Sequence, residues 1–112
     1  SKSITVPDPT SSEDLTMLFA DAAYTITRMN AVVIGTSPSV TWTVRKNSDR
    51  SAAGTEVVTG GTVTTSITTG SDVSTFNSAT ISHGDWIWLE TTATGGTVTQ
   101  LHLTIHMQQT ST

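Results

Sequence analysis

Hydroxyl groups are the most abundant reactive side chains in this sequence, which holds 25 threonines and 14 serines among its 112 residues. A serine or threonine becomes a nucleophile only when a base is held beside it, and the imidazoles available are His83, His102 and His106. His83 falls in a predicted turn with Gly84 and Asp85, where polar side chains commonly bond their own backbone. No Gly-x-Ser-x-Gly nucleophile elbow occurs. We therefore predict that the chain is not an enzyme and has no catalytic residues.

Metal and cofactor sites are not predicted either. His102 and His106 project from one face of the last predicted strand, where four residues separate them by about 13 Å, too far to share an ion. The adjacent acids Glu13 and Asp14 are typical of the first turn of a helix, and the other aspartates lack calcium-loop spacing. The sequence has no cysteine and no glycine-rich phosphate loop. A weak cation site between loops is the alternative that this pattern leaves open.

Trp86 and Trp88 are candidate partner-binding residues. They alternate with Ile87 and Leu89, so their predicted strand is apolar on both faces. The first interpretation of the pair is a core position, the second a subunit interface, and the third a platform on which a sugar ring stacks. Trp42, which lies between two valines on an alternating strand, is predicted to be a core residue.

The first twelve residues form the second candidate interface. Ile4 and Val6 alternate in a short apolar strand, and the Pro-Asp-Pro that follows keeps this segment out of a central sheet position. Residues 1–12 are predicted to be the edge strand of the domain or, alternatively, an arm that pairs with the sheet of a neighbour. The candidate interface residues are Ile4, Val6, Trp86 and Trp88.

The elements that position these residues are predicted to be β-strands. Residues 40–45 and 101–108 alternate between apolar and polar side chains, as half-buried strands do. Turns containing glycine are predicted at residues 35–39, 60–61 and 93–96.

The remaining segments, taken with these strands, predict the fold class. Residues 13–23 fit either a helical turn or a bulged strand, and a bulge is also predicted near Arg28 and Met29. About eight strands, spaced roughly 8–12 residues apart, indicate an all-β protein. We predict a two-sheet antiparallel sandwich resembling a jelly roll, with residues 13–112 as its single domain.

Composition limits the range of partners. The net charge is −4, the isoelectric point is about 5.0 and only 12% of residues are charged, which argues against a nucleic-acid surface. Arg45, Lys46 and Arg50 cluster around one predicted loop and are interpreted as a solvated turn. The N-terminal segment has no apolar signal core and no apolar run has transmembrane length, so no membrane partner is expected.

Several runs carry a resemblance to a known family. They are AYTITRM (23–29), GTSPSVTWTVR (35–45), DRSAAGTEVV (49–58), FNSATI (76–81) and GDWIWLETT (84–92). With the last strand they cover about residues 20–107. This threonine- and glycine-rich pattern resembles a β-domain that recurs in the virion proteins of tailed bacteriophages.

The resemblance implies a jelly-roll capsid decoration (cement) protein. Such proteins sit on the outer head surface, commonly as trimers, and clamp neighbouring major capsid subunits against the pressure of the packaged DNA. The expectation is thus a homotrimer that binds the major capsid protein on the virion and assembles in the host cytoplasm. The alternative is a tail-fibre or baseplate domain that binds a receptor or a glycan. The resemblance supplies no catalytic residue or cofactor.

Overall fold

A computed structural model describes residues 1–59 and 61–110 of the protein. In this part of the chain there are eight β-strands and no helix, so no helix long and apolar enough to cross a membrane is present. The strands are β1 (Lys2–Pro7), β2 (Asp14–Phe19), β3 (Tyr24–Asn47), β4 (Thr55–Glu56), β5 (Thr62–Thr64), β6 (Ser71–Val73), β7 (Thr80–Ile81) and β8 (Trp86–Gln109).

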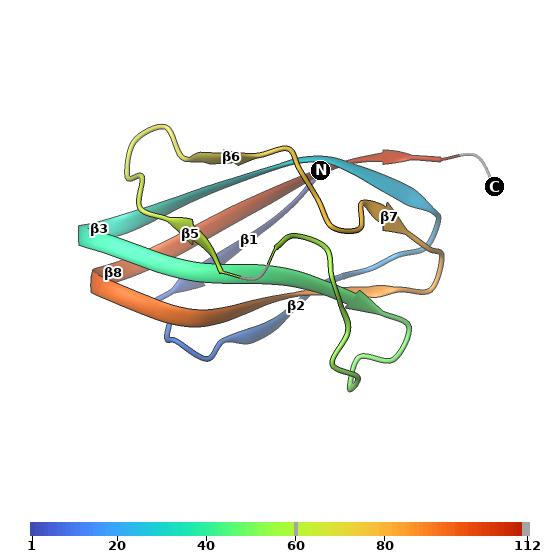
Figure 1. Cartoon of the computed structure of the whole chain (residues 1–112), viewed down its shortest axis with the longest axis horizontal. Helices are drawn as coiled ribbons and strands as arrows, with labels where there is room; N and C mark the ends of the chain where they lie inside the picture. The colour runs from blue at the N-terminus through green and yellow to red at the C-terminus, as the bar shows by residue number, and fades with distance from the viewer. Residues whose placement is uncertain (60, 111–112) are drawn as a thin grey trace.

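Two strands of 24 residues, β3 and β8, form the centre of the molecule. They pair antiparallel over their full length, from Tyr24 opposite Gln109 to Asn47 opposite Trp86, and so make one two-stranded ribbon. Figure 1 shows that the ribbon runs along the long axis and folds back on itself at one end. The two halves of the ribbon therefore lie over each other in a body measuring 45 × 28 × 20 Å.

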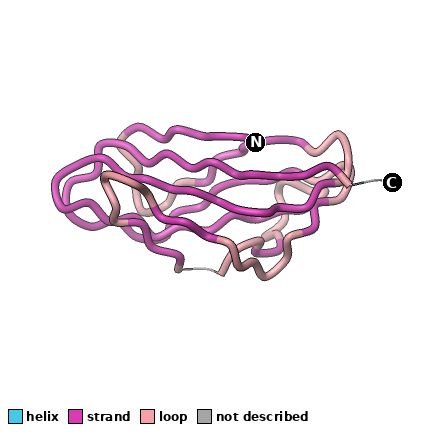
Figure 2. The backbone as a smooth tube through the Cα atoms, turned by 90° about the horizontal axis from the view of Figure 1, so that it is seen from above, coloured by secondary structure: helices cyan, strands magenta, loops and turns pink. Residues whose placement is uncertain are grey.

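Each half of the ribbon is widened by shorter strands. In the half that we call layer A, β1 pairs with the end of β8 while β6 and β7 pair with the start of β3. In the other half, layer B, β2 pairs with the start of β8 while β4 and β5 pair with the end of β3. Figure 2 shows the strands of both layers running along the same axis.

The all-β antiparallel class is confirmed, and a jelly-roll sandwich is compatible with the structure. The hydrogen bonding differs from the prediction of two sheets, because the eight strands belong to one continuous sheet. The number of strands agrees with the prediction, but the points at which strands begin and end do not. Residues 35–39 and 93–96, predicted to be turns, lie within β3 and β8 and are the places where the long strands bend.

The bend depends on backbone conformations that only a few residues adopt. Ser37 and Gly96 have positive φ angles of 47° and 63°. A Cβ atom on Gly96 would overlap the carbonyl oxygen of Ser37, so the two strands approach too closely there for any side chain. Shifts in pairing register on both sides of this point let the ribbon turn without ending the strands.

Two other predictions are resolved by the structure. Residues 14–19 form the bulged strand, with a register shift between Thr16 and Leu18, so the helical alternative and its first-turn role for Glu13 and Asp14 are wrong. The predicted bulge near Arg28 is present as a register shift between Ile26 and Arg28. Of the hairpin predicted at residues 60–61, Gly60 lies outside the described residues; the flanking β4 and β5 each pair with β3.

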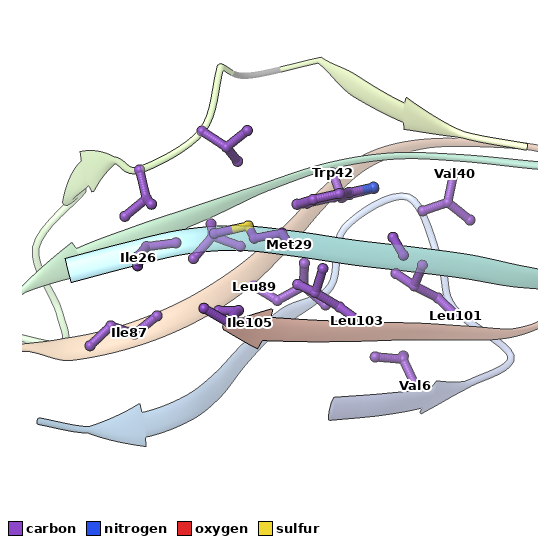
Figure 3. Close-up of a cluster of buried hydrophobic side chains, with 14 of the residues drawn as sticks. Val6, Ile26, Met29, Val40, Trp42, Ile87, Leu89, Leu101, Leu103 and Ile105 are labelled. Atoms are coloured by element: carbon purple, nitrogen blue, oxygen red, sulfur yellow. The ribbon is translucent and has the colours of Figure 1, made fainter. Parts of the chain in front are cut away.

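The core lies between the two layers and is filled by inward-facing side chains of the ribbon, as Figure 3 shows. Trp42 is confirmed as a core residue, 1% exposed, and its indole nitrogen donates to the buried hydroxyl of Thr64 at 2.9 Å. Both edges of the ribbon contribute, because Val6 of β1 and Ile81 of β7 are buried in the same cluster. The largest fully buried aliphatic side chains are Met29, Ile81, Ile87, Leu89, Leu101, Leu103 and Ile105.

Candidate interaction site

The two histidines of β8 lie in a hydrogen-bonded network on the outer face of layer A. The imidazole of His102 bonds the hydroxyls of Thr5 at 2.7 Å and Thr104 at 3.1 Å. His106 bonds the amide oxygen of Asn30 at 2.9 Å, and the Asn30 amide donates to Asp72 at 3.0 Å. Apart from the bond between His102 and Thr104 within β8, these bonds join neighbouring strands, so the histidines are partly buried structural residues of the sheet surface.

The third histidine, His83, is exposed in the turn before β8. The side chain that bonds the turn backbone is that of Asp85, which accepts from the Ser82 amide at 3.0 Å. Among the described residues, no group of three or more histidine, aspartate or glutamate side chains could hold a metal ion. The three histidines considered in the sequence analysis therefore form no common metal-binding group in the described part of the chain.

The basic cluster of residues 45–50 is paired with acids from distant strands. Arg45 contacts Glu56 at 3.0 Å and Glu90 at 3.1 Å. Arg50 contacts Asp14 at 2.5 Å. The interpretation of this cluster as a solvated turn misses these partners, because they lie up to 45 residues away in the chain.

Trp88 is the residue around which this network is built. Its side chain lies on the outer face of layer B, yet it is 0% exposed. The Arg50 guanidinium lies 4.4 Å from the centre of the ring, and the indole nitrogen donates to Glu90 at 2.7 Å. Gly54 packs directly on the ring, since a Cβ atom there would come within 2.6 Å of it. The loop of residues 48–54 thus covers Trp88.

Trp86 lies on the same outer face but is only partly buried. Its ring packs against that of Phe19, its cross-strand neighbour on β2, with ring centres 4.8 Å apart and planes tilted by 56°. Phe19 is 49% exposed. Sequence reasoning did not single out Phe19, although the strand alternation that resumes after the bulge places it opposite Trp86.

A pocket of about 320 Å³ opens beside this aromatic pair, and we call it the mouth pocket. It forms where the start of β1, the end of β2, the start of β3 and the end of β8 meet. Its lining residues are Ser1, Lys2, Leu18, Phe19, Asp21, Tyr24 and Met107.

A hydrogen bond fixes the polar part of the mouth pocket. The Tyr24 hydroxyl donates to Asp21 at 2.9 Å. This bond raises the pKa of Tyr24 above its usual value of 10.0, with smaller contributions from desolvation and from the negative charge of Asp21. The protonated phenol thus keeps the carboxylate in place.

A second, polar pocket of about 280 Å³ lies at the same end of the molecule, lined by Lys46, Asn47, Ser48, Thr55, Ser82 and Asp85. The Lys46 ammonium donates to the carbonyl of Thr80. Burial lowers the pKa of Lys46, and the negative charge of Asp85 partly offsets this shift. Its amine is thus occupied by the protein's own backbone.

The N-terminal candidate residues lie within the fold of their own chain. Residues 2–7 pair with β8, from Lys2 opposite Ile105 to Pro7 opposite Gln100, as the edge-strand interpretation requires. Val6 is 3% exposed and Trp88 is 0% exposed, so neither offers surface to a partner. Ile4 is half-buried against the core, and Trp86 is the partly buried member of the aromatic pair with Phe19.

Comparison with known proteins finds no matching family model, no matching curated protein and no matching solved structure.

Proposed function

We propose that this chain is a structural module of a tailed-bacteriophage virion, a capsid decoration (cement) protein that bridges major capsid subunits on the outer surface of the head. The sequence resemblance over about residues 20–107 is the starting point. The proposal places the chain on the virion as a homotrimer, assembled in the host cytoplasm. It gives the chain a mechanical role and no catalytic one.

The observation that carries the proposal is the β3–β8 ribbon. Its two strands of 24 residues are joined along their whole length and are braced on both edges by further strands. A force along the long axis would act on all of these backbone hydrogen bonds together, because antiparallel bonds lie perpendicular to the strands. A clamp that resists internal pressure needs this kind of stiffness.

Exposed apolar side chains support self-association. Ile34, Val63 and Ile67 are 49%, 50% and 54% exposed, although the chain has few charges to keep such residues soluble. A symmetric oligomer covers the same surface on every copy. Light scattering should give about three times the chain mass of 11.8 kDa. A monomer at micromolar concentration would contradict a stable free trimer.

The direct test is to add the purified protein to phage heads stripped of their decoration and to image them by cryo-electron microscopy. We expect density on the outer head surface at the junctions between capsid subunits, and heads that survive heating better than undecorated ones. The Ile67→Asp variant should decorate less because it places a charge on this exposed apolar surface, whereas Thr68→Asp, one residue away, should decorate normally. Binding to tails alone, or no binding, would reject the proposal.

One observation favours the alternative of a tail-fibre or baseplate domain that binds a receptor or glycan. The Phe19–Trp86 pair leaves an aromatic ring half exposed beside a pocket, which is an arrangement suited to ligand binding. Antibody labelling of intact particles would separate the two functions, because it would place the protein on heads or on tails.

A further inference from the structure

The mouth pocket has a feature that a mechanical role does not explain, namely an exposed aromatic ring held in a fixed position. Phe19 lies at the end of β2, where it belongs both to the aromatic pair and to the pocket lining. Trp86 supports its ring at 4.8 Å from across the strand pair. A ring held in this way loses little conformational freedom when a ligand covers it, which favours binding.

Polar groups face the same space. Asp21 uses one carboxylate oxygen, Oδ1, to accept from Tyr24, and its other oxygen is left without a partner among the described residues. Lys2 also lines the pocket, and its side chain carries an ammonium donor. Leu18 and Met107 provide the apolar part of the pocket. The site thus combines an aromatic surface with one acceptor and one donor.

We propose that the mouth pocket binds a single neutral hexopyranose ring, as a free sugar or as the terminal residue of a glycan. The C–H face of the sugar would cover Phe19 in the manner of an aromatic contact, its hydroxyls would donate to the free oxygen of Asp21, and Lys2 would donate to a ring substituent. A volume of about 320 Å³ is at the lower end of the range for small-molecule sites, as expected for one ring.

A sugar fits this site better than a protein partner does. A stable protein interface buries roughly 800 Å² on each side around an apolar centre. At this end of the molecule Phe19 is the one strongly exposed large apolar residue described, since Ile34 lies beside the bend of β3 and Val63 and Ile67 lie on or after β5, which pairs with residues 40–42 of β3. The charged groups beside Phe19 suit hydroxyls and would have to be desolvated under an apolar partner.

The inference can be tested on the free chain by NMR, with the indole N–H signal of Trp86 as the reporter. Methyl β-glucopyranoside and methyl β-galactopyranoside are titrated to millimolar concentrations. We expect at least one of them to shift the Trp86 signal in a saturable way. Phe19→Ala should weaken binding roughly tenfold and Phe19→Tyr should preserve it, because the tyrosine ring keeps the stacking surface. Asp21→Asn should weaken it as well, because the amide accepts hydroxyl protons less strongly.

Thr68→Ala is the control, because it truncates an exposed side chain that does not line the pocket, and it should bind like the unmodified chain. The proposal is wrong if neither glycoside shifts the Trp86 signal, or if Phe19→Ala binds equally well. It is also wrong if the signal shifts with protein concentration alone, which would identify a second copy of the chain as the occupant. None of these results depends on capsid binding, so this test and the head-decoration test can fail separately.

Discussion

Trp86 and Trp88 are two residues apart on one strand and face the same way, yet one is partly exposed and the other is completely buried. The difference lies in what covers them. Over Trp88 the loop of residues 48–54 closes, held by Arg50 and Gly54. Over Trp86 lies the ring of Phe19, which is itself half exposed.

This comparison shows how a sheet with a small core gains a second buried region. Trp88 is outside the main cluster between the layers, on the other face of layer B. Charged side chains, which would otherwise be solvated, cover an aromatic ring and pair with acids around it. The Trp88 region therefore stabilises the fold, whereas the Trp86 region leaves apolar surface available for a ligand.

The largest difference between the two regions should appear when each tryptophan is removed. Trp88→Ala should lower the free energy of unfolding by about 3–5 kcal/mol, because it leaves a cavity beneath the loop. Trp86→Ala should lower it by only about 1 kcal/mol, the value of one partly exposed aromatic contact. Urea denaturation of both variants measures the gap. Equal losses would show that the loop does not seal Trp88 as the structure indicates.

A smaller effect is expected from filling the space above Trp88. Gly54→Ala places a Cβ atom against the ring and also strains a residue with a φ angle of +81°. The clash and the backbone strain together should lower the free energy of unfolding by about 2–4 kcal/mol. Gly84→Ala is the matched control, since its φ angle is +94° but nothing lies within 4 Å of the new atom.

Gly84→Ala should therefore lower the free energy of unfolding only through backbone strain, by about 1 kcal/mol or slightly more. The difference between the two variants isolates the packing of the loop on Trp88. A Gly84 variant as unstable as the Gly54 variant would assign the whole effect to the backbone.

The charge above Trp88 should contribute less still. Arg50→Gln removes the guanidinium from the ring and from Asp14, whose side chain is 58% exposed, so we expect a loss of about 1 kcal/mol. Arg28→Gln, which breaks the more exposed pair with Asp72, should change stability by less than about 0.5 kcal/mol. Chemical denaturation at low and high salt measures how screening changes this loss. High salt should reduce the stability difference between Arg50→Gln and the unmodified chain but not abolish it, since the ring contact is partly desolvated. An effect that high salt removes completely would argue against the ring contact.

The smallest effect concerns the pH response of the covering loop. The Ser51 hydroxyl and amide donate to Asp49 at 2.7 and 2.9 Å and lower the pKa of this carboxyl below its usual value of 3.8. A carboxyl whose pKa is lower in the folded state stabilises that state above pH 3.8, and this contribution disappears as the pH falls through the lowered pKa.

We therefore expect the unmodified chain to be slightly more stable than Asp49→Asn at neutral pH, and the gap to close in acid. Ser51→Ala should reproduce most of the change, because the hydroxyl bond is the largest cause of the shift. Urea titrations near neutral pH and near pH 2 give the comparison. A gap that is the same at both pH values would exclude the charge of Asp49 as its cause.

The strand pattern of the chain was largely predictable because local alternation reports which face of a strand is buried. Val40, Trp42 and Val44 were placed inward and are 0–1% exposed. The same reasoning misjudged residues 35–39 and 93–96, since glycine, serine and proline favour turns whether or not the flanking strands stay paired. Nothing local distinguishes the end of a strand from the bend of a long one.

The site was less predictable than the fold. Trp86 and Trp88 have the same residue type on the same face of one strand. Their sequence context therefore gave both the same order of interpretations, with core position first, subunit interface second and sugar platform third. Phe19 lies in a segment whose sequence fitted either a helical turn or a bulged strand. The face of the sheet on which its side chain lies depends on the bulge between Thr16 and Leu18, which local sequence did not settle.

The sequence by itself determined the all-β class, the inward set of side chains and the absence of disulfides, because composition and period-two alternation act over a few residues. Only the tertiary structure decided that β3 and β8 are single strands folded over each other, since that depends on pairing between residues as distant as Tyr24 and Gln109. It alone decided that Arg50 and Gly54 cover Trp88 while Trp86 stays open. Burial is a property of what the rest of the chain places above a residue, and residue type does not encode it.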